Sequence, residues 1–211
     1  MKFEKYHISR PIKENIDRLG FKRPTDIQFK AIPSIMNNED VMAIAQTGTG
    51  KTAAFAIPVI DKIHRSKFEN KRPGIRCLVM VPTRELAAQI GDVFQSLAKK
   101  TRVKVLSIYG GVDQDPQIKR LIKGVDVLVT TPGRMFDLIS QGYIRLQNVE
   151  TLWQPCSGLA RSIIAQGGME EAKTLADNSV DVLAAMNTGV LLMQENAEKK
   201  IKDSLRAQRS L

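Results

Sequence analysis

The chain has 211 residues, of which 43% are hydrophobic and 26% charged, and its formal net charge is +10. These values predict one folded domain, with or without an appendage, and they exclude a globally disordered chain. It contains no run of about 18 apolar residues and no apolar core of a signal peptide near its start, so we expect no transmembrane helix and no membrane partner. Two cysteines cannot build a disulfide framework or a zinc site, which favours a soluble protein of the reducing cytoplasm.

The charge divides the chain into two parts. Residues 1–152 contain 25 Lys and Arg against 15 Asp and Glu, whereas residues 153–211 contain 7 of each kind. All ten Phe and Tyr residues also lie in the first part, and the single tryptophan is Trp153. We therefore predict two pieces, a basic domain over residues 1–152 and an unrelated, mainly helical tail over residues 153–211. A basic domain suits a polyanionic partner, although a merely soluble basic surface explains the charge equally well.

The basic part begins with two predicted helices. Ser9 and Pro11 begin the first, and Thr25 with Gln28, in capping-box spacing, begins the second. Short β-branched runs then predict buried strands at Val41–Ala45, Cys77–Val81, Val103–Tyr109 and Val125–Thr130. Apolar residues at three and four spacing predict helices over residues 51–65, 83–99, 114–123 and 132–140. A polar loop is expected over residues 66–76. This alternation predicts an α/β fold with a parallel sheet over residues 38–152.

A candidate phosphate loop follows the first predicted strand. Residues 45–52 read Ala-Gln-Thr-Gly-Thr-Gly-Lys-Thr and open a predicted helix. Gly48 and Gly50 let the backbone curl so that N–H groups face phosphate oxygens, and the helix dipole adds positive potential. Lys51 is expected to reach the β- and γ-phosphates, and the Thr52 hydroxyl to bind Mg²⁺. Ala45 departs from the general pattern, which has glycine there, and a Gly-rich turn with an exposed lysine is the alternative.

Residues 1–152 resemble the first RecA-like domain of the DEAD-box RNA helicases. The resemblance rests on motifs in the family's order: the Q motif at Gly20–Gln28, the phosphate loop at Ala45–Thr52, motif Ia at Pro82–Ala87, the double glycine at Gly110–Gly111, and motif Ib at Thr131–Arg134. Ala45 belongs to the family's own form of the phosphate loop, and Tyr6 stands where an upstream aromatic residue is usual. The resemblance covers 152 of the 211 residues and implies a RecA-like fold that binds ATP, Mg²⁺ and RNA.

The resemblance also implies which residues form an ATP site. Gln28 is the implied adenine reader, because a primary amide pairs with both N6–H and N7 of adenine. Phe21 is the implied ring on the adenine face, and simple helix capping is the alternative role of Gln28. The other implied nucleotide contacts are Gln46, Thr47, Gly48, Thr49, Gly50, Lys51 and Thr52, of which Thr52 is also the implied metal ligand.

An RNA surface is implied by the motifs that follow predicted strand ends, at the sheet edge where open α/β sheets bind ligands. Its implied residues are Pro82, Thr83, Arg84, Gly110, Gly111, Thr131, Pro132, Gly133 and Arg134. The family uses these positions to hold the sugar–phosphate backbone, and such contacts carry little sequence information. Single-stranded or duplex RNA should therefore bind weakly, without sequence preference and with a steep dependence on salt.

The resemblance stops after Leu152. In the family, the strand that begins at Val149 ends in Asp-Glu-Ala-Asp, but here Trp153-Gln-Pro-Cys-Ser-Gly158 follows. The chain contains no Asp-Glu dipeptide, no Ser-Ala-Thr motif and no second RecA-like domain with an arginine finger. These groups hold Mg²⁺, orient the attacking water and stabilise the transition state. We therefore assign no catalytic residue and expect ATP binding without useful hydrolysis or unwinding.

The tail carries an apolar stripe at three and four spacing, consisting of Leu183, Met186, Val190, Met193, Ala197, Ile201 and Leu205. Residues 169–206 are expected to form one helix or a helical hairpin, with a break near Gly189. The apolar face of this helix either packs against a hydrophobic core or binds a protein partner. An interrupted reading frame, a gene fusion or an assembly error would each explain why the resemblance stops after Leu152. Three roles stay open: part of an RNA helicase, a non-catalytic nucleotide- or RNA-binding module with a partner or oligomerisation helix, or an unstable fragment.

Overall fold

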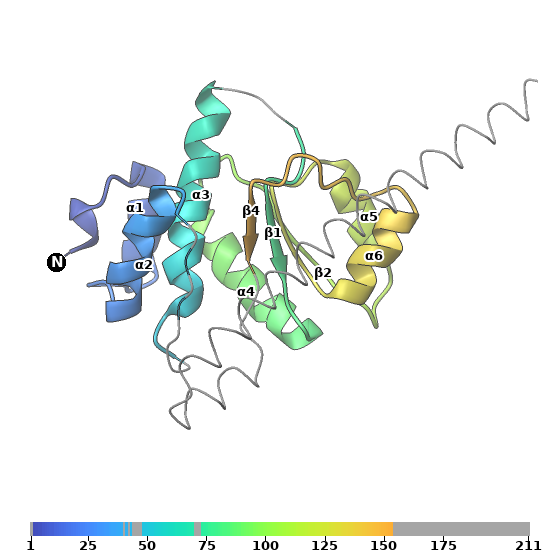
Figure 1. Cartoon of the computed structure of the whole chain (residues 1–211), viewed down its shortest axis with the longest axis horizontal. Helices are drawn as coiled ribbons and strands as arrows, with labels where there is room; N and C mark the ends of the chain where they lie inside the picture. The colour runs from blue at the N-terminus through green and yellow to red at the C-terminus, as the bar shows by residue number, and fades with distance from the viewer. Residues whose placement is uncertain (1, 40, 42, 44–47, 70–72, 154–211) are drawn as a thin grey trace, which may run out of the picture. The chain divides into compact units, whose positions relative to one another are not determined.

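The computed structural model of the chain describes residues 2–39, 41, 43, 48–69 and 73–153, shown in colour in Figure 1. The predicted strand at Val41–Ala45, the loop residues Gln46 and Thr47, and the tail with its predicted helix over residues 169–206 lie outside the described residues, wholly or for the most part. Residues 2–135 and 145–153 belong to one compact unit, and residues 136–144 belong to a second. The fold and the sites below concern the first unit.

Parallel strands form the centre of this unit. They are β1 (Cys77–Met80), β2 (Val105–Ile108), β3 (Val127–Thr130) and β4 (Thr151–Trp153), in the spatial order β2-β3-β1-β4. Every neighbouring pair is parallel, with Leu78 opposite both Leu128 and Leu152. All residues of β1 and β3 are buried, as continuous apolar runs predict for inner strands of a parallel sheet. The predicted parallel α/β fold is confirmed.

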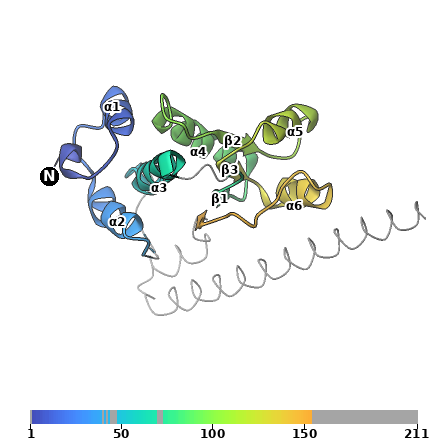
Figure 2. The same cartoon turned by 90° about the horizontal axis from the view of Figure 1, so that it is seen from above.

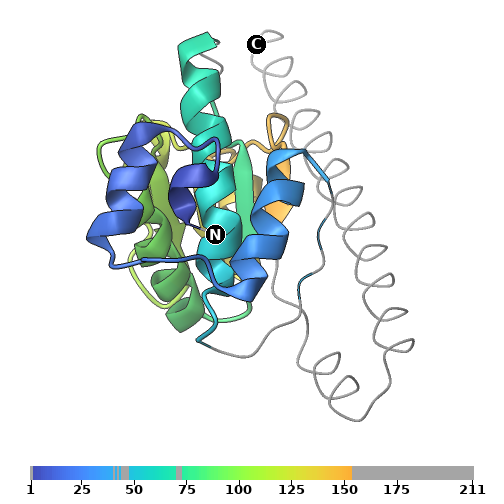
Figure 3. The same ribbon diagram turned by 90° about the vertical axis from the view of Figure 1, so that its left-hand side faces the viewer.

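Helices cover both faces of the sheet. The helices of the described residues are α1 (Arg10–Arg18), α2 (Asp26–Met36), α3 (Lys51–Glu69), α4 (Arg84–Leu97), α5 (Asp115–Ile122) and α6 (Pro132–Ser140), preceded by a short 3-10 helix η1 (Phe3–Lys5). Seen from above, α3 and α4 lie on one face and α5 on the other (Figure 2). The two N-terminal helices α1 and α2 flank α3 (Figure 3). The helix α6 begins in the first unit and continues into the second, where Leu138, Ile139 and Ile144 are buried.

The helix α3 ends at Glu69, later than the sequence pattern predicts, so the expected loop over residues 66–76 begins too early. Its last turn is held by long-range contacts. Lys67 Nζ donates to the Arg102 carbonyl at 2.8 Å and pairs with Asp126 Oδ2 at 2.6 Å. The Ser66 hydroxyl accepts from Arg76 Nη1. These partners stabilise a polar turn that has no apolar periodicity of its own.

The core joins α3 to the sheet and to the N-terminal helices. The Phe55 ring lies 5.3 Å from that of Phe94 and stacks on Trp153, with ring centroids 4.2 Å apart. Cys77 of β1 is fully buried, and burial raises the pKa of its thiol to about 12. Asn15 Nδ2 donates to the carbonyls of Leu97 and Lys99, at 2.8 and 2.6 Å, and thereby caps the end of α4 from α1. Among the described residues, no helix is both long and apolar enough to span a bilayer.

Candidate functional site

The phosphate loop is described from Gly48 onward. Gly48 and Gly50 have φ angles of 80° and 81°, in the left-handed region that glycine adopts without steric strain. Lys51 begins α3 directly after them, and Thr52 follows in the first helical turn. The first N–H groups of α3 and the positive end of its dipole therefore face the loop. Figure 1 shows the strands pointing toward the end of the sheet at which α3 begins.

A hydrogen-bonded link joins the start of α2 to the phosphate loop. Gln28 is only 1% exposed; its Oε1 accepts from the Thr25 N–H at 3.0 Å, and its Nε2 donates to the Gly50 carbonyl at 3.2 Å. The Thr25 hydroxyl donates to the Thr49 carbonyl at 2.8 Å. The predicted capping box is thus present, and it extends to the loop. Sequence reasoning missed the role of Thr25 as a loop contact, because the two segments lie more than twenty residues apart.

Gly50 has no room for a side chain. A Cβ atom at this position would clash with Gln28 Nε2 and would lie 3.8 Å from the Thr25 hydroxyl oxygen. The glycine therefore serves both the backbone conformation and the approach of the Gln28 amide. Phe21, the other predicted adenine contact, is half-buried and packs against the hydrophobic core beside these elements.

The predicted RNA residues lie at one edge of the sheet, because each motif follows the carboxyl end of a parallel strand. Pro82 and Thr83 follow β1, Gly110 and Gly111 follow β2, and the segment Thr131–Arg134 follows β3 and opens α6. All of them are exposed or half-exposed. In open α/β sheets this edge is where ligands bind.

Two guanidinium groups flank the loop that follows β2. A Cβ on Gly111, whose φ is 78°, would lie 3.0 Å from Arg84 Nη1. Next to it along the loop, Arg134 Nη2 donates to the Val112 carbonyl at 3.0 Å, while its buried Nη1 has no hydrogen-bond partner. The three motifs, which lie far apart in the sequence, therefore meet around Gly111–Val112.

Charge at this edge is modulated by Glu85. Its Oε1 accepts from Arg84 Nε at 2.7 Å, and this hydrogen bond lowers the pKa of the Glu85 carboxyl. The same bond raises the pKa of Arg84. Thr83 caps α4, since its Oγ1 accepts from the Leu86 N–H at 3.2 Å.

The double-glycine loop is shaped from α5 by a residue that sequence reasoning missed. Gln117 is 9% exposed; its Oε1 accepts from the Tyr109 N–H at 3.1 Å, and its Nε2 donates to the carbonyls of Tyr109 and Asp113, at 3.3 and 3.0 Å. The Gln117 amide therefore pairs with both the N–H and the carbonyl of Tyr109, in place of a backbone partner. A glutamine on an amphipathic helix has no sequence signal for this role.

Comparison with known proteins decides the family. Residues 25–152 match the family described as DEAD/DEAH box helicase. The chain belongs to this family. It is 43% identical over 150 residues to the DEAD-box ATP-dependent RNA helicase CshA of Geobacillus kaustophilus. This aligned segment covers 71% of this chain and 31% of that protein. The CshA protein of Bacillus subtilis is also 43% identical over 150 residues and is covered over 29% of its length.

The fold agrees with a solved helicase-family structure. The crystal structure of a DEAD box protein from Methanococcus jannaschii superimposes with a TM-score of 0.67 at 37% identity, over 84% of this chain and 46% of that one. The chain spans 31% and 29% of the length of the two CshA relatives named above. The resemblance that the motifs indicate is confirmed at the level of family and fold.

The described residues of this helicase domain suit a nucleotide with a phosphate-bound metal ion. Gly48 and Gly50 hold the loop backbone in the left-handed conformation, and Lys51 and Thr52 stand at its helix end. In the described part of the chain, no group of three or more His, Cys, Asp or Glu side chains could hold a metal ion.

Proposed function

We propose that the chain is the ATP-binding and RNA-binding portion of a DEAD-box ATP-dependent RNA helicase, and that alone it binds both ligands without useful hydrolysis or unwinding. The link from Thr25 and Gln28 to the phosphate loop is the observation that carries the nucleotide part. The proposed domain covers residues 1–152, and the family match that ends at Leu152 supports this boundary. Residues 153–211 are the proposed unrelated tail.

Gln28 is suited to recognise adenine while it holds the loop. An amide has two N–H donors and an acceptor oxygen with two lone pairs. The bonds to Thr25 and Gly50 use one donor and one lone pair. A second donor and a second lone pair match N7 and N6–H of adenine, as a glutamine does in DNA recognition. Phe21 would pack on the base, and the loop N–H groups and Lys51 would bind the phosphates. The Thr52 hydroxyl would hold Mg²⁺, which would supply positive charge beside the phosphates.

Nucleotide titration tests this assignment. We expect the chain to bind ATP more tightly than GTP, because guanine presents an oxygen acceptor where adenine presents N6–H. Gln28→Ala should remove most of this preference, because each lost hydrogen bond to the base costs about 1 kcal/mol of binding free energy. Lys51→Ala should weaken the binding of both ATP and GTP. Calorimetric titration measures both constants. Gln89→Ala, at an exposed position of α4, is the matched control.

Equal affinity of the folded wild-type chain for ATP and GTP would remove the role given to Gln28. If a folded sample binds neither nucleotide, the assignment of the phosphate loop is wrong. Circular dichroism of each variant separates these outcomes from a loss of structure.

RNA binding is proposed along the carboxyl edge, where Arg84, Gly111 and Arg134 meet. Each cation that neutralises a phosphate releases a counterion, so binding should weaken steeply with salt. We propose that the affinity of this edge by itself is low and independent of RNA sequence, because contacts to phosphates carry little sequence information.

Opposite effects at two neighbouring residues test this edge. Arg84→Gln should weaken RNA binding and lower the slope of log K against log salt by about 0.7, the value for one phosphate contact of a single strand. Glu85→Gln should strengthen binding, because it removes the carboxylate that pairs with Arg84. Fluorescence anisotropy with a labelled single-stranded RNA measures both. An affinity that does not change between low and high salt would rule out phosphate contacts.

Location and further partners belong to the same proposal. A reducing cytoplasm is supported by Cys77, which is a free, buried thiol. The apolar stripe from Leu183 to Leu205, within the expected helix over residues 169–206, supports a protein partner for the tail on sequence pattern alone.

A further inference from the structure

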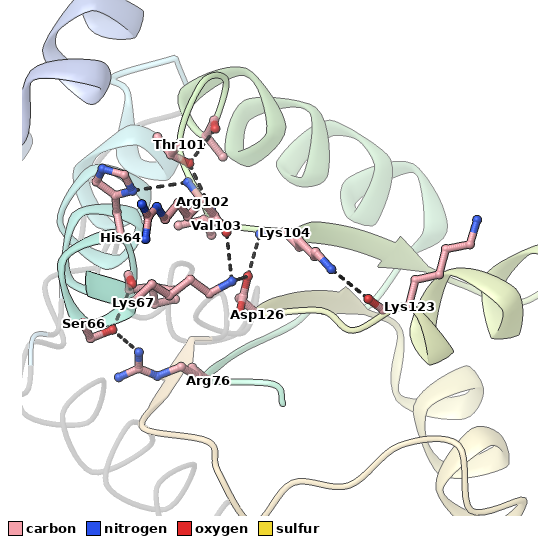
Figure 4. A network of polar contacts seen from close by, with 12 residues as sticks. His64, Ser66, Lys67, Arg76, Thr101, Arg102, Val103, Lys104, Lys123 and Asp126 are labelled. Atoms are coloured by element: carbon pink, nitrogen blue, oxygen red, sulfur yellow. Dashed lines mark hydrogen bonds and ion pairs between the residues drawn. The ribbon is translucent and has the colours of Figure 1, made fainter. Parts of the chain in front are cut away.

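Basic residues also gather at the opposite edge of the sheet, where the strands begin. Lys99 and Lys100 follow α4, Arg102 and Lys104 lead into β2, and Lys123 follows α5. All five side chains are exposed. Lys104 Nζ donates to the Lys123 carbonyl at 2.8 Å, which brings the two connections side by side (Figure 4). These five residues are called the amino-edge basic patch.

The acidic group in contact with this patch is buried beneath it. Asp126 is 4% exposed, and its Oδ2 accepts from the Lys104 N–H and from Lys67 Nζ, both at 2.6 Å. Its charge is therefore balanced by Lys67, whose side chain is 20% exposed. None of the five patch side chains forms an ion pair with a carboxylate in the described residues. Among the side chains that the structure describes, the exposed charge of this surface is consequently positive.

An exposed aromatic ring adjoins the patch. Phe68, in the last turn of α3, is 63% exposed, and the Arg102 guanidinium lies 4.1 Å from its ring centroid. The His64 ring meets Phe68 edge-on at 5.2 Å, and His64 Nδ1 accepts from the Arg102 N–H at 3.3 Å. His64 thus links the Phe68 ring to the segment that carries the lysines.

We propose that the amino-edge basic patch, together with Phe68, is a second RNA-binding surface of this chain. The lysines and Arg102 would contact phosphates, and Phe68 with the guanidinium plane would stack on bases. Proteins that bind single strands without sequence preference combine these two kinds of contact. The surface uses none of the residues of the carboxyl edge, from which it is separated by strands of four residues, or roughly 13 Å.

The aromatic ring favours RNA over an acidic protein as the partner. Acidic side chains would be attracted by the lysines alone and would gain little from an exposed ring. Bases have π faces that stack on both phenyl and guanidinium planes. Two surfaces on one domain also predict that a long single strand binds more tightly than a short one, since the second contact becomes intramolecular.

A triple variant with a matched control tests the surface in the full chain. Lys99→Gln, Arg102→Gln and Lys104→Gln together remove three exposed positive charges. Lys2→Gln, Lys5→Gln and Arg10→Gln remove the same charge from exposed positions near the N-terminus. Anisotropy titrations use a short and a long labelled uridine oligomer over a range of salt. The patch variant should lower the salt slope with the long oligomer by about 2, at roughly 0.7 per phosphate contact.

Phe68→Ala separates RNA from an acidic partner. We expect it to weaken RNA binding roughly tenfold, the scale of one base–aromatic stack, and to leave the binding of polyglutamate unchanged. ATP binding and circular dichroism should be the same for all variants. Equal behaviour of the patch and control variants would overturn the proposal. So would a patch variant that loses RNA and polyglutamate equally while Phe68→Ala has no effect, because the surface would then fit an acidic protein. Loss of RNA binding by Arg84→Gln tests the carboxyl edge, where Arg84 lies, and does not bear on the amino-edge basic patch.

Discussion

The purified chain is expected to release phosphate from ATP at a rate close to the uncatalysed background, with or without RNA, and to displace no strand from an RNA duplex. Phosphoryl transfer depends on groups that hold the metal and orient the attacking water. The 211 residues contain no Asp-Glu dipeptide to supply them after β4. Removal of one stabilising donor typically lowers kcat by about 10²–10³, and an arginine finger contributes about 10³–10⁵.

The structure adds a physical reason at the same position. Trp153, the last residue of β4, stacks on Phe55 of α3, with an angle of 12° between the rings. The end of β4 is therefore tied into the core by an apolar ring. No described side chain there offers a carboxylate, since Glu150 is paired with Arg76 at the other end of the strand.

Phosphate release in the presence of saturating RNA measures this prediction. Lys51→Ala is the control, because it removes the lysine proposed to bind the β- and γ-phosphates. Turnover near that of an intact helicase, abolished by Lys51→Ala, would show that residues beyond Leu152 supply the missing groups. Turnover that Lys51→Ala does not change would point to a contaminating ATPase.

Gly50→Ala is expected to weaken ATP binding by more than tenfold and to destabilise the fold. Alanine at a φ of 81° carries a strain of about 1–2 kcal/mol. Its Cβ would also clash with Gln28 Nε2, so the amide would have to leave the Gly50 carbonyl. Because Gln28 is buried, displacement leaves its polar atoms without partners, which costs about 1–3 kcal/mol more.

A double-mutant cycle with Gln28→Ala separates the two causes. In the Gln28→Ala background no amide is present to clash, so Gly50→Ala should show only the backbone strain. Gly142→Ala is the stability control, because its φ is 79° and no atom lies within 4 Å of the added Cβ. Urea unfolding and ATP titration measure the free energies. Additive effects of Gly50→Ala and Gln28→Ala would mean that the contact between these residues is not the cause.

The parallel sheet and the family were predictable because their signals are local. A continuous apolar run such as Cys77–Met80 buries both faces of a strand wherever it lies, and the order of strands and helices then requires parallel connections. The phosphate loop is equally local, since Gly48, Gly50 and Lys51 act within one turn of backbone. Capping by Gln28 follows from its spacing to Thr25.

Contacts between distant segments could not be predicted from those patterns. The bond from Gln28 to Gly50, the three bonds of Gln117 around Tyr109, and the helical turn of α3 held by Lys67 each depend on a partner placed by the sheet. The spacing of side-chain amides and ammonium groups along the sequence does not indicate which groups they will bind.

The sequence by itself determined the α/β class and the family, because hydrophobic periodicity and glycine conformations act over a few residues. Only the tertiary structure decided which charges are exposed and where they gather. Lys99, Arg102 and Lys104 contribute to the net charge like any other cations until burial of Asp126 beneath them leaves one surface positive. Likewise, Arg84 and Arg134 meet at Gly111–Val112 only because parallel strands end at a common edge. Electrostatic potential depends on the distances between charges in space, and a count of charged residues in the sequence gives no such distances.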